Sequence, residues 1–278
     1  MGLRHIRGGK RQAPPFFLGP ILIIQEIWRN RNLTKHLVKK DIKLAYHGTF
    51  LGYFWTMLEP LLMTVILYTL FVIMRGSTDE FLPLKVMLGI LFYACFSKTT
   101  SMCNNVLLQQ SSLINQVYFP REIFHINVVA YQLYRLVMSL IIIIPMMAWY
   151  NLSPSVYLFW LLPSALGVGM LGLGFGMITS ILQVKIRDVS QLVQVLLRGA
   201  FFISGVFYGA EHVPSQWLDV HLLNPVAVFI ELSRTAVLGD MGVLDLTNIV
   251  YALGVSFIVM VIGMCIFKKF EARMVKYL

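Results

Sequence analysis

Six apolar runs that are long enough to cross a membrane constrain this chain more than any other feature. They cover residues 54–74, 86–108, 127–150, 156–182, 190–208 and 248–267. A transmembrane helix needs about 20 apolar residues, at about 1.5 Å each, to cross roughly 30 Å of hydrocarbon. With 58% hydrophobic and 13% charged residues in 278, the chain is too apolar for a water-soluble fold. We therefore expect an all-α, polytopic membrane protein with six transmembrane helices.

The charged residues divide the chain into a basic N-terminal segment (1–53), a transmembrane domain (54–267) and a basic tail (268–278). The loop over 211–245, in contrast, holds five acidic residues and one arginine. Lys and Arg are enriched in loops on the cytoplasmic side, so we expect both termini to be cytoplasmic. The formal net charge of +10 then reports membrane orientation, and nucleic acid is not an expected partner.

An amphipathic helix is expected over residues 33–46. On a helical wheel its apolar residues fill one arc, and the opposite arc carries Lys35, Lys39, Lys40 and Lys43. Such a helix lies in the headgroup plane with its lysines toward anionic lipid or a partner; a plain surface anchor and a partner-binding interface helix both remain open. The apolar stretch 16–24 is interrupted by Gly19 and Pro20 and lacks a cleavage site, which indicates a retained segment on the membrane surface.

The region between the fifth and sixth runs predicts re-entrant helices. Its apolar part, 222–230, is too short to span a bilayer and contains Asn224-Pro225, and Pro214 precedes it. Non-helical backbone at membrane depth is tolerated only where protein or a water-filled cavity surrounds it. We expect two short helices on the outer side, where they would cap a pathway.

The sequence carries no recognisable catalytic motif. Gly167, Gly169 and Gly172 match GxGxxG, but they lie inside an apolar helix and not at a strand-to-helix turn. Gly172 and Gly176 form GxxxG, which lets two membrane helices approach closely. No GxxxxGK[ST] loop occurs in the printed sequence, so any ATP and Mg²⁺ would be bound by another subunit. The three cysteines show no metal-ligand spacing, and we expect no cofactor or metal in this chain.

Four ionisable residues fall inside predicted spans, each on a different one: Glu59, Lys98, Arg135 and Arg198. A charge at the bilayer centre costs roughly 2.5–3.5 kcal/mol on insertion scales unless it is paired or hydrated. All four are expected in the inner half of the bilayer, with Glu59 paired to Arg135 or Arg198. They predict a hydrated, positively charged inner vestibule that attracts an anionic substrate; interhelical struts are the alternative.

Residues 41–60, DIKLAYHGTFLGYFWTMLEP, resemble the start of type-2 ABC exporter permeases, the membrane subunits that export O-antigen, capsular polysaccharide and wall teichoic acid. The resemblance continues at Phe119-Pro120-Arg121-Glu122, at Arg187-Asp188, at the SGVFY motif ending in Tyr208, and at Asn224-Pro225 with Arg234. Ala45 stands where relatives usually carry arginine, and Glu59 where they more often carry an uncharged amide.

The resemblance implies a homodimer in the bacterial cytoplasmic membrane that works with two separate ATPase subunits. The loop over 112–124 would be the coupling helix that docks into the ATPase, with Ser112, Phe119, Pro120, Arg121 and Glu122 at the contact. The outer re-entrant region would include Tyr208 and Arg234. The implied cargo is a lipid-linked anionic glycan or a teichoic acid polymer that enters at the cytoplasmic side, and membrane lipid is a further expected partner.

Two other functions remain open at this stage. One is an ABC exporter of a drug or a free lipid built on the same architecture. The other is a passive channel or scaffold that needs no ATPase.

Overall fold

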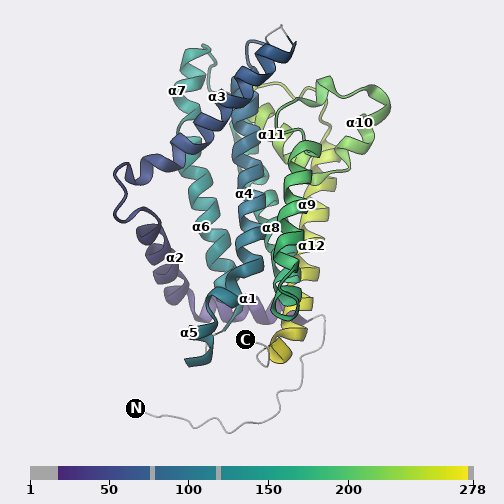
Figure 1. Ribbon diagram of the computed structural model, residues 1–278. Helices are drawn as coiled ribbons and strands as arrows, with labels where there is room; N and C mark the ends of the chain where they lie inside the picture. Colours follow the sequence, from purple (N-terminus) through teal and green to yellow (C-terminus); the bar gives the residue numbers. More distant parts are fainter. Residues whose placement is uncertain (1–17, 76–78, 117–119, 275–278) are drawn as a thin grey trace.

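The chain folds as a bundle of helices in the computed structural model, which describes residues 18–75, 79–116 and 120–274 (Figure 1). Five helical stretches are long and apolar enough to cross a membrane: 52–73, 82–109, 122–149, 156–185 and 246–271. The described part contains no β-strand. The expectation of an all-α, polytopic membrane protein is confirmed.

Long helices form most of the bundle. They are α3 (Trp55–Arg75), α4 (Leu82–Gln109), α6 (Glu122–Leu140), α8 (Leu161–Lys185), α9 (Val189–Ile203) and α12 (Leu246–Met274). Shorter helices are α1 (Gly19–Arg29), α2 (Arg31–Tyr46), α5 (Ser111–Gln116), α7 (Ile143–Trp149), α10 (Ser215–Leu222) and α11 (Pro225–Leu238). Among the described residues, 3₁₀ turns at Gly52–Phe54, Val156–Trp160 and Ala210–His212 connect these helices. Helix α12 runs through the first seven residues of the expected tail.

Helix α1, helix α5 and the last turns of α12 lie at one end of the bundle, the lower end in Figure 1. We call it the α1 end. Helices α7, α10 and α11 lie at the other, which we call the α10 end. Because α1 and the last turns of α12 share an end, the chain crosses the bundle an even number of times.

The fifth crossing is shorter than the sequence predicts. Helix α9 ends at Ile203, and Gly205, whose φ is +66°, turns the chain away before Tyr208. Its 15 residues reach about 22 Å at 1.5 Å each, which falls short of a bilayer's hydrocarbon core. The predicted span 190–208 therefore has the wrong C-terminal boundary.

The third crossing is broken into α6 and α7. Pro145 lies in the first turn of α7 and lacks a backbone N–H, and its ring clashes with the carbonyl four residues earlier, at Ile141. The chain accordingly leaves the α-helix at Ile141 and Ile142 before it continues. The span predicted over 127–150 is therefore present, as two helices joined by a short turn at Ile141 and Ile142.

Helix α8 is the central element because it packs against both α4 and α12 along its length. Glycines on two of its faces allow this. A Cβ on Gly172 or Gly176 would lie 2.7 Å or 2.3 Å from Cβ of Thr99 or Cys103 on α4. The close helix approach predicted from GxxxG is confirmed. On another face Gly174 meets Gly263 of α12, and a Cβ on Gly174 would lie 2.6 Å from the carbonyl oxygen of Val259.

We predict that Gly174→Ala destabilises the protein by about 1–3 kcal/mol, the usual cost of overpacking a tight core. The added methyl group meets α12 backbone and not a flexible side chain, so the two helices must separate. The measurement is thermal unfolding of the purified protein in detergent. Gly254→Ala on α12 is the control, since no atom lies within 4 Å of its Cβ position; equal melting temperatures for the two variants would refute the prediction.

The predicted re-entrant pair is present as α10 and α11. Helix α10 is largely exposed, whereas every residue of α11 from Val226 to Val237 is buried. Asn224 caps α11 by accepting a hydrogen bond from the Val226 N–H at 3.0 Å, and Pro225 occupies its first turn. Because protein surrounds α11, its free helix ends are not exposed to lipid.

Helix α1 was not predicted as a packed element. Gly19 and Pro20, interpreted above as an interruption, form its first turn. Ile23 is completely buried, and Gly19 packs on the backbone of Cys265 in α12. The predicted helix over 33–46 lies within α2, which packs on α6 and exposes Lys35, Lys39, Lys40 and Lys43. In Figure 1 α2 is inclined to α1 and does not share its plane.

Candidate functional site

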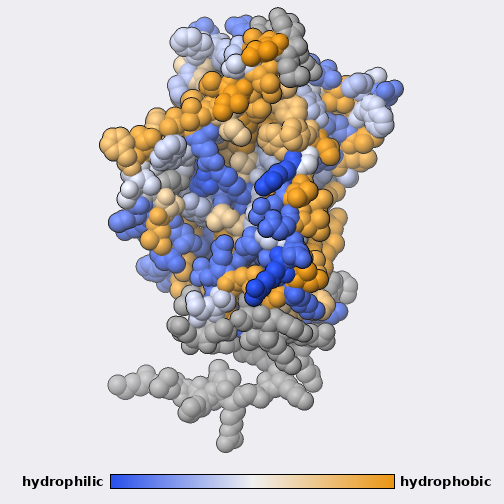
Figure 2. Space-filling view, in the orientation of Figure 1, coloured by the Kyte–Doolittle hydropathy of each residue, from blue (hydrophilic) through white to orange (hydrophobic). Residues whose placement is uncertain are grey.

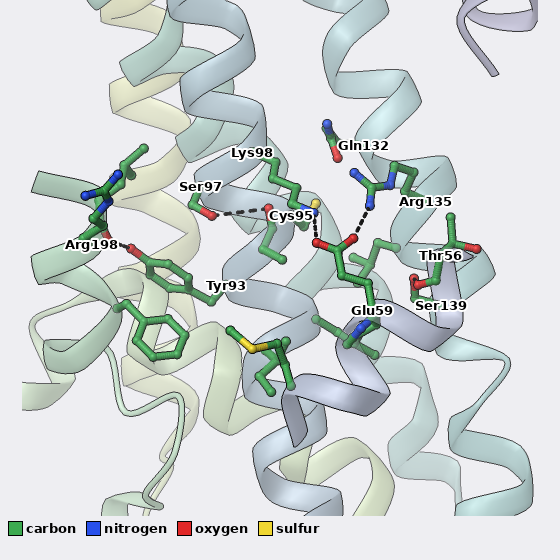
Figure 3. Close-up of a pocket in the computed structure, with 18 of the residues that line it drawn as sticks. Thr56, Glu59, Tyr93, Cys95, Ser97, Lys98, Gln132, Arg135, Ser139 and Arg198 are labelled. Atoms are coloured by element: carbon green, nitrogen blue, oxygen red, sulfur yellow. Dashed lines mark hydrogen bonds and ion pairs between the residues drawn. The ribbon is translucent and has the colours of Figure 1, made fainter. Parts of the chain in front are cut away.

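A pocket of about 540 Å³ lies between α3, α4, α6 and α9 (Figure 3). Its lining includes all four charged residues that the sequence places inside predicted spans: Glu59, Lys98, Arg135 and Arg198. Each comes from a different helix, so only the tertiary fold brings them together. The remaining lining is mostly apolar, with Thr56, Ser97, Gln132 and Ser139 as further polar groups.

Glu59 bridges two of the three cations in this pocket. Its Oε1 lies 2.8 Å from Nζ of Lys98, and its Oε2 lies 3.2 Å from Nη2 of Arg135. The predicted pair with Arg135 is confirmed, the alternative pair with Arg198 is absent, and the contact with Lys98 was not predicted. The side chain of Glu59 is 53% exposed, which in a spanning helix means that water or another protein surface must meet it.

Arg198 lies on the other side of the pocket, on α9, and points away from Glu59 in Figure 3. It is exposed, and among the residues that the structure describes no carboxylate pairs with it. The pocket therefore holds three cations and one carboxylate, a formal charge of +2. An excess of this kind at membrane depth is expensive unless an anion or water compensates it.

A polar surface leads from the pocket toward the α1 end. From Ala94 onward the accessible residues of α4 recur at helical spacing and include Ser97, Lys98, Ser101 and Asn105. Helix α9 presents Gln191, Gln194 and Arg198 at the same kind of spacing. Figure 2 shows hydrophilic surface running down this face beneath the apolar α3. We call these residues of α4 and α9 the polar track.

Aromatic side chains form the wall of the pocket near α9. Phe201 and Phe202 line it, and the ring of Tyr93 meets that of Phe201 edge to face at 5.3 Å between centroids. The Tyr93 hydroxyl donates to the carbonyl oxygen of Leu197. Phe92 and Phe96, by contrast, are buried in the core. Of these aromatic residues, only the accessible Phe202 and the partly accessible Phe201 have faces available to a ligand.

At the α10 end, Arg234 fixes the turn that follows α9. Its five N–H groups donate to the carbonyl oxygens of Lys85, Gly205, Val206 and Tyr208 at 2.8–3.1 Å and to Oε1 of Glu231 at 2.6 Å. Arg234 is only 3% exposed. Every donor of the guanidinium is used, so this predicted outer residue holds α4, α11 and the turn together. The other predicted outer residues, Tyr208, Pro214, Asn224 and Pro225, lie in the turn, before α10 and at the start of α11.

Lys85, at the same end of the bundle, forms ion pairs with two acidic residues. Its Nζ lies 2.6 Å from Asp79 Oδ2 and 2.7 Å from Glu211 Oε1. Burial raises the pKa of each carboxyl, but the hydrogen bonds and charge of Lys85 outweigh it, and the pKa of both Asp79 and Glu211 is lowered. These two contacts tie the start of α4 to the segment before α10.

At the α1 end, Lys268 of α12 joins three helices. Its Nζ lies 2.6 Å from Glu122, 3.0 Å from Glu271 and 3.3 Å from Glu26 of α1. The side chain of Glu122 has no exposed area. Next to it Arg121 lies 3.6 Å from the Glu271 carboxylate. We call Arg121, Glu122, Lys268, Glu271 and Glu26 the α12 cluster.

The residues of the predicted coupling loop separate into two groups. Ser112 is exposed on α5, where a partner can reach it. Arg121 and Glu122 face inward to the α12 cluster, and Pro120 before them is half-buried. Phe119 lies outside the described residues. The loop is therefore held to α12 by its last residues, while α5 protrudes at the α1 end (Figure 1).

Comparison with known proteins agrees with this architecture. The family described as ABC-2 type transporter matches residues 32–238, which cover α2 through α11. The chain belongs to the ABC-2 type transporter family. It is therefore a multi-pass membrane protein of a transport family, as predicted.

Individual relatives extend the comparison beyond the family. The chain is 24% identical over 244 residues to the O-antigen export system permease protein RfbA of Klebsiella pneumoniae, covering 87% of this chain and 93% of that protein. It is 28% identical over 190 residues to the protein of the same name in Myxococcus xanthus, covering 68% and 72%. The polysialic acid transport protein KpsM of Escherichia coli is 23% identical over 244 residues, covering 86% and 93%.

Proposed function

We propose that this chain is the membrane-spanning permease subunit of an ABC exporter, and that its cargo is a polysaccharide carried on an anionic lipid. The observation that supports this most is the polar track leading to a pocket of charge +2. Relatives covering most of the chain are named for O-antigen export and polysialic acid transport. Amide and hydroxyl groups along the track can exchange hydrogen bonds with sugar hydroxyl groups as a glycan passes.

The pathway requires a second surface opposite the track. Helix α3 and helix α9 expose apolar residues on the same side of the bundle, among them Leu62, Ile66 and Leu70 on α3 and Leu196 and Ile203 on α9. In a homodimer two such faces would enclose the two polar tracks as one hydrated passage. The apolar side chains would then contact the second copy or lipid.

Energy would come from two separate ATPase subunits that bind ATP and Mg²⁺, since the printed sequence contains no P-loop. Helix α5 would dock on the ATPase, and the exposed lysines of α2 would lie beside it at the cytoplasmic side of the bacterial inner membrane. Arg121 and Glu122 would act indirectly, by holding the docking segment to α12. Both termini would be cytoplasmic.

Depleting the protein in its native host is expected to cause lipid-linked polysaccharide to accumulate in the cytoplasm and to disappear from the cell surface. Antibodies against the surface glycan, applied to intact and to permeabilised cells, measure both pools. An exporter of a drug or a free lipid would leave both pools unchanged. A passive channel or scaffold is tested by purification, because an exporter retains a P-loop ATPase subunit and a passive protein does not.

A further inference from the structure

We infer that the Glu59 carboxylate occupies an anion-binding site that a diphosphate group takes over during transport, so that Glu59 is an exchangeable counter-ion and not a strut. The inference rests on the proposed function and names the chemistry that its pocket recognises. Four observations carry it: the geometry of the cations, the surplus charge, the exposure of Glu59 and the loose packing of the helix that bears it.

The cations are arranged as a receptor for an oxyanion. Lys98 and Arg135 approach different oxygens of one carboxylate, at 2.8 Å and 3.2 Å, from two different helices. Two cationic donors that converge on separate oxygens suit a phosphate group as well as a carboxylate. In Figure 3 both side chains reach toward Glu59 from the α4 and α6 sides. The Lys98 ammonium and the Arg135 guanidinium are therefore preorganised to bind an anion, which can be the Glu59 carboxylate or a ligand.

The charge of the pocket exceeds what Glu59 can neutralise. One carboxylate pairs with Lys98 and Arg135, and the third cation, Arg198, lies on the other side of the pocket. A diphosphate that links a lipid to a glycan carries two negative charges near neutral pH, so in the place of Glu59 it would neutralise more of the charge of the three cations than the single carboxylate does. A diphosphate is also longer than the Glu59 carboxylate, which pairs with only two of the three cations.

Glu59 is free to leave its position. Its side chain is 53% exposed, compared with 36% for Lys98 and 21% for Arg135, so the carboxylate is the most accessible member of the triad. It lies one turn into α3. In the most apolar part of this helix 17% of the residues are buried, compared with 67% in α4. Pro60 follows it and removes a backbone N–H from the helix. Lys98 is thus on a well-packed helix, and its counter-ion is on the least buried of the five spanning stretches.

The test is binding of a long-chain polyprenyl diphosphate to the purified full chain in nanodiscs, with Glu59→Gln as the decisive variant. Removing the competing carboxylate is expected to tighten binding about tenfold, which corresponds to about 1.4 kcal/mol. The Lys98→Ala/Arg135→Ala double variant is expected to weaken binding at least about tenfold, and Arg198→Gln less. Glu80→Gln is the matched control, because Glu80 is exposed and does not line the pocket; its binding should equal that of the unaltered protein.

A strut and a counter-ion give opposite signs in this experiment. If Glu59→Gln keeps its melting temperature and binds the polyprenyl diphosphate no more tightly, or more weakly, the inference is wrong. Polyprenol without the diphosphate binding equally well would show that the lipid chain and not the anion is recognised, which also overturns it. Inorganic pyrophosphate binding as tightly as the lipid would overturn the lipid headgroup as the source of the anion.

These outcomes are independent of the proposed function. Binding is measured without an ATPase and without transport, so a negative result removes the anion site and leaves the exporter proposal standing. If the chain binds the diphosphate lipid as expected but exports no glycan from cells, the anion site stands and the exporter proposal is wrong.

Discussion

Replacing Arg234 with alanine is expected to cost at least about 3 kcal/mol of stability, because one change removes five hydrogen bonds and leaves a buried acid without its cation. Glu231, at 9% exposure, keeps only the Ala210 N–H as a donor when Arg234 is gone. Breaking a buried ion pair by removing one partner typically costs about 3–5 kcal/mol. The carbonyl oxygens of Gly205, Val206 and Lys85 lose a donor as well.

The measurement is the thermal melting temperature and the yield of monodisperse protein in detergent. Arg187→Ala is the matched control, because this arginine is exposed in the turn between α8 and α9, and it should change stability by less than about 0.5 kcal/mol. Adding Glu231→Gln to Arg234→Ala should recover part of the loss by removing the unpaired charge. If Arg234→Ala has the same melting temperature as the unaltered protein, Arg234 does not hold the turn after α9.

Replacing Lys268 with methionine is expected to have an effect of similar size at the opposite end of the bundle. Methionine preserves much of the side-chain volume but leaves Glu122, whose side chain has no exposed area, without its cation at 2.6 Å. Glu26 and Glu271 lose the same partner, and Arg121 would remain as the cation nearest to Glu271. We expect a loss of about 3–5 kcal/mol and weaker coupling of ATP hydrolysis to export, since Glu122 begins the helix that follows the docking segment.

A double-mutant cycle separates the charge from the packing. Glu122→Gln combined with Lys268→Met should be more stable than Lys268→Met alone, with an interaction energy of about 0.5–3 kcal/mol. Lys185→Met is the control: this lysine is exposed at the end of α8, and its replacement should change stability by less than about 0.5 kcal/mol. An additive cycle, with no interaction energy, would mean that Lys268 and Glu122 are not coupled.

The sequence predicts the helical architecture well because a membrane span is a local property. Length and apolarity alone place α3, α4, α8 and α12, and a short apolar stretch with Asn224-Pro225 predicts α10 and α11. The errors arise where a few residues override the average. Pro145 divides the third span, and Ser204 and Gly205 end α9 early although the hydropathy of the following residues stays high.

The candidate site was predicted in part, for an instructive reason. Counting residues from the predicted span ends places Glu59, Lys98, Arg135 and Arg198 at similar depth, but depth does not reveal which helix faces meet. The Glu59–Lys98 contact and the isolation of Arg198 depend on how α3, α4 and α9 are rotated about their axes. The inward direction of Arg121 and Glu122 depends on the end of α12, which lies about 150 residues away in the chain.

The measurement that tests the central claim most directly is ATP-driven transfer of a lipid-linked polysaccharide across liposomes that contain this chain and its ATPase subunit. A glycan-degrading enzyme trapped in the lumen of the liposomes reports each molecule that arrives from outside. The account predicts that degradation requires ATP and falls at least about tenfold in the Lys98→Ala/Arg135→Ala variant. Transfer at the same rate without ATP, or no transfer by the complete complex while it hydrolyses ATP, would contradict it.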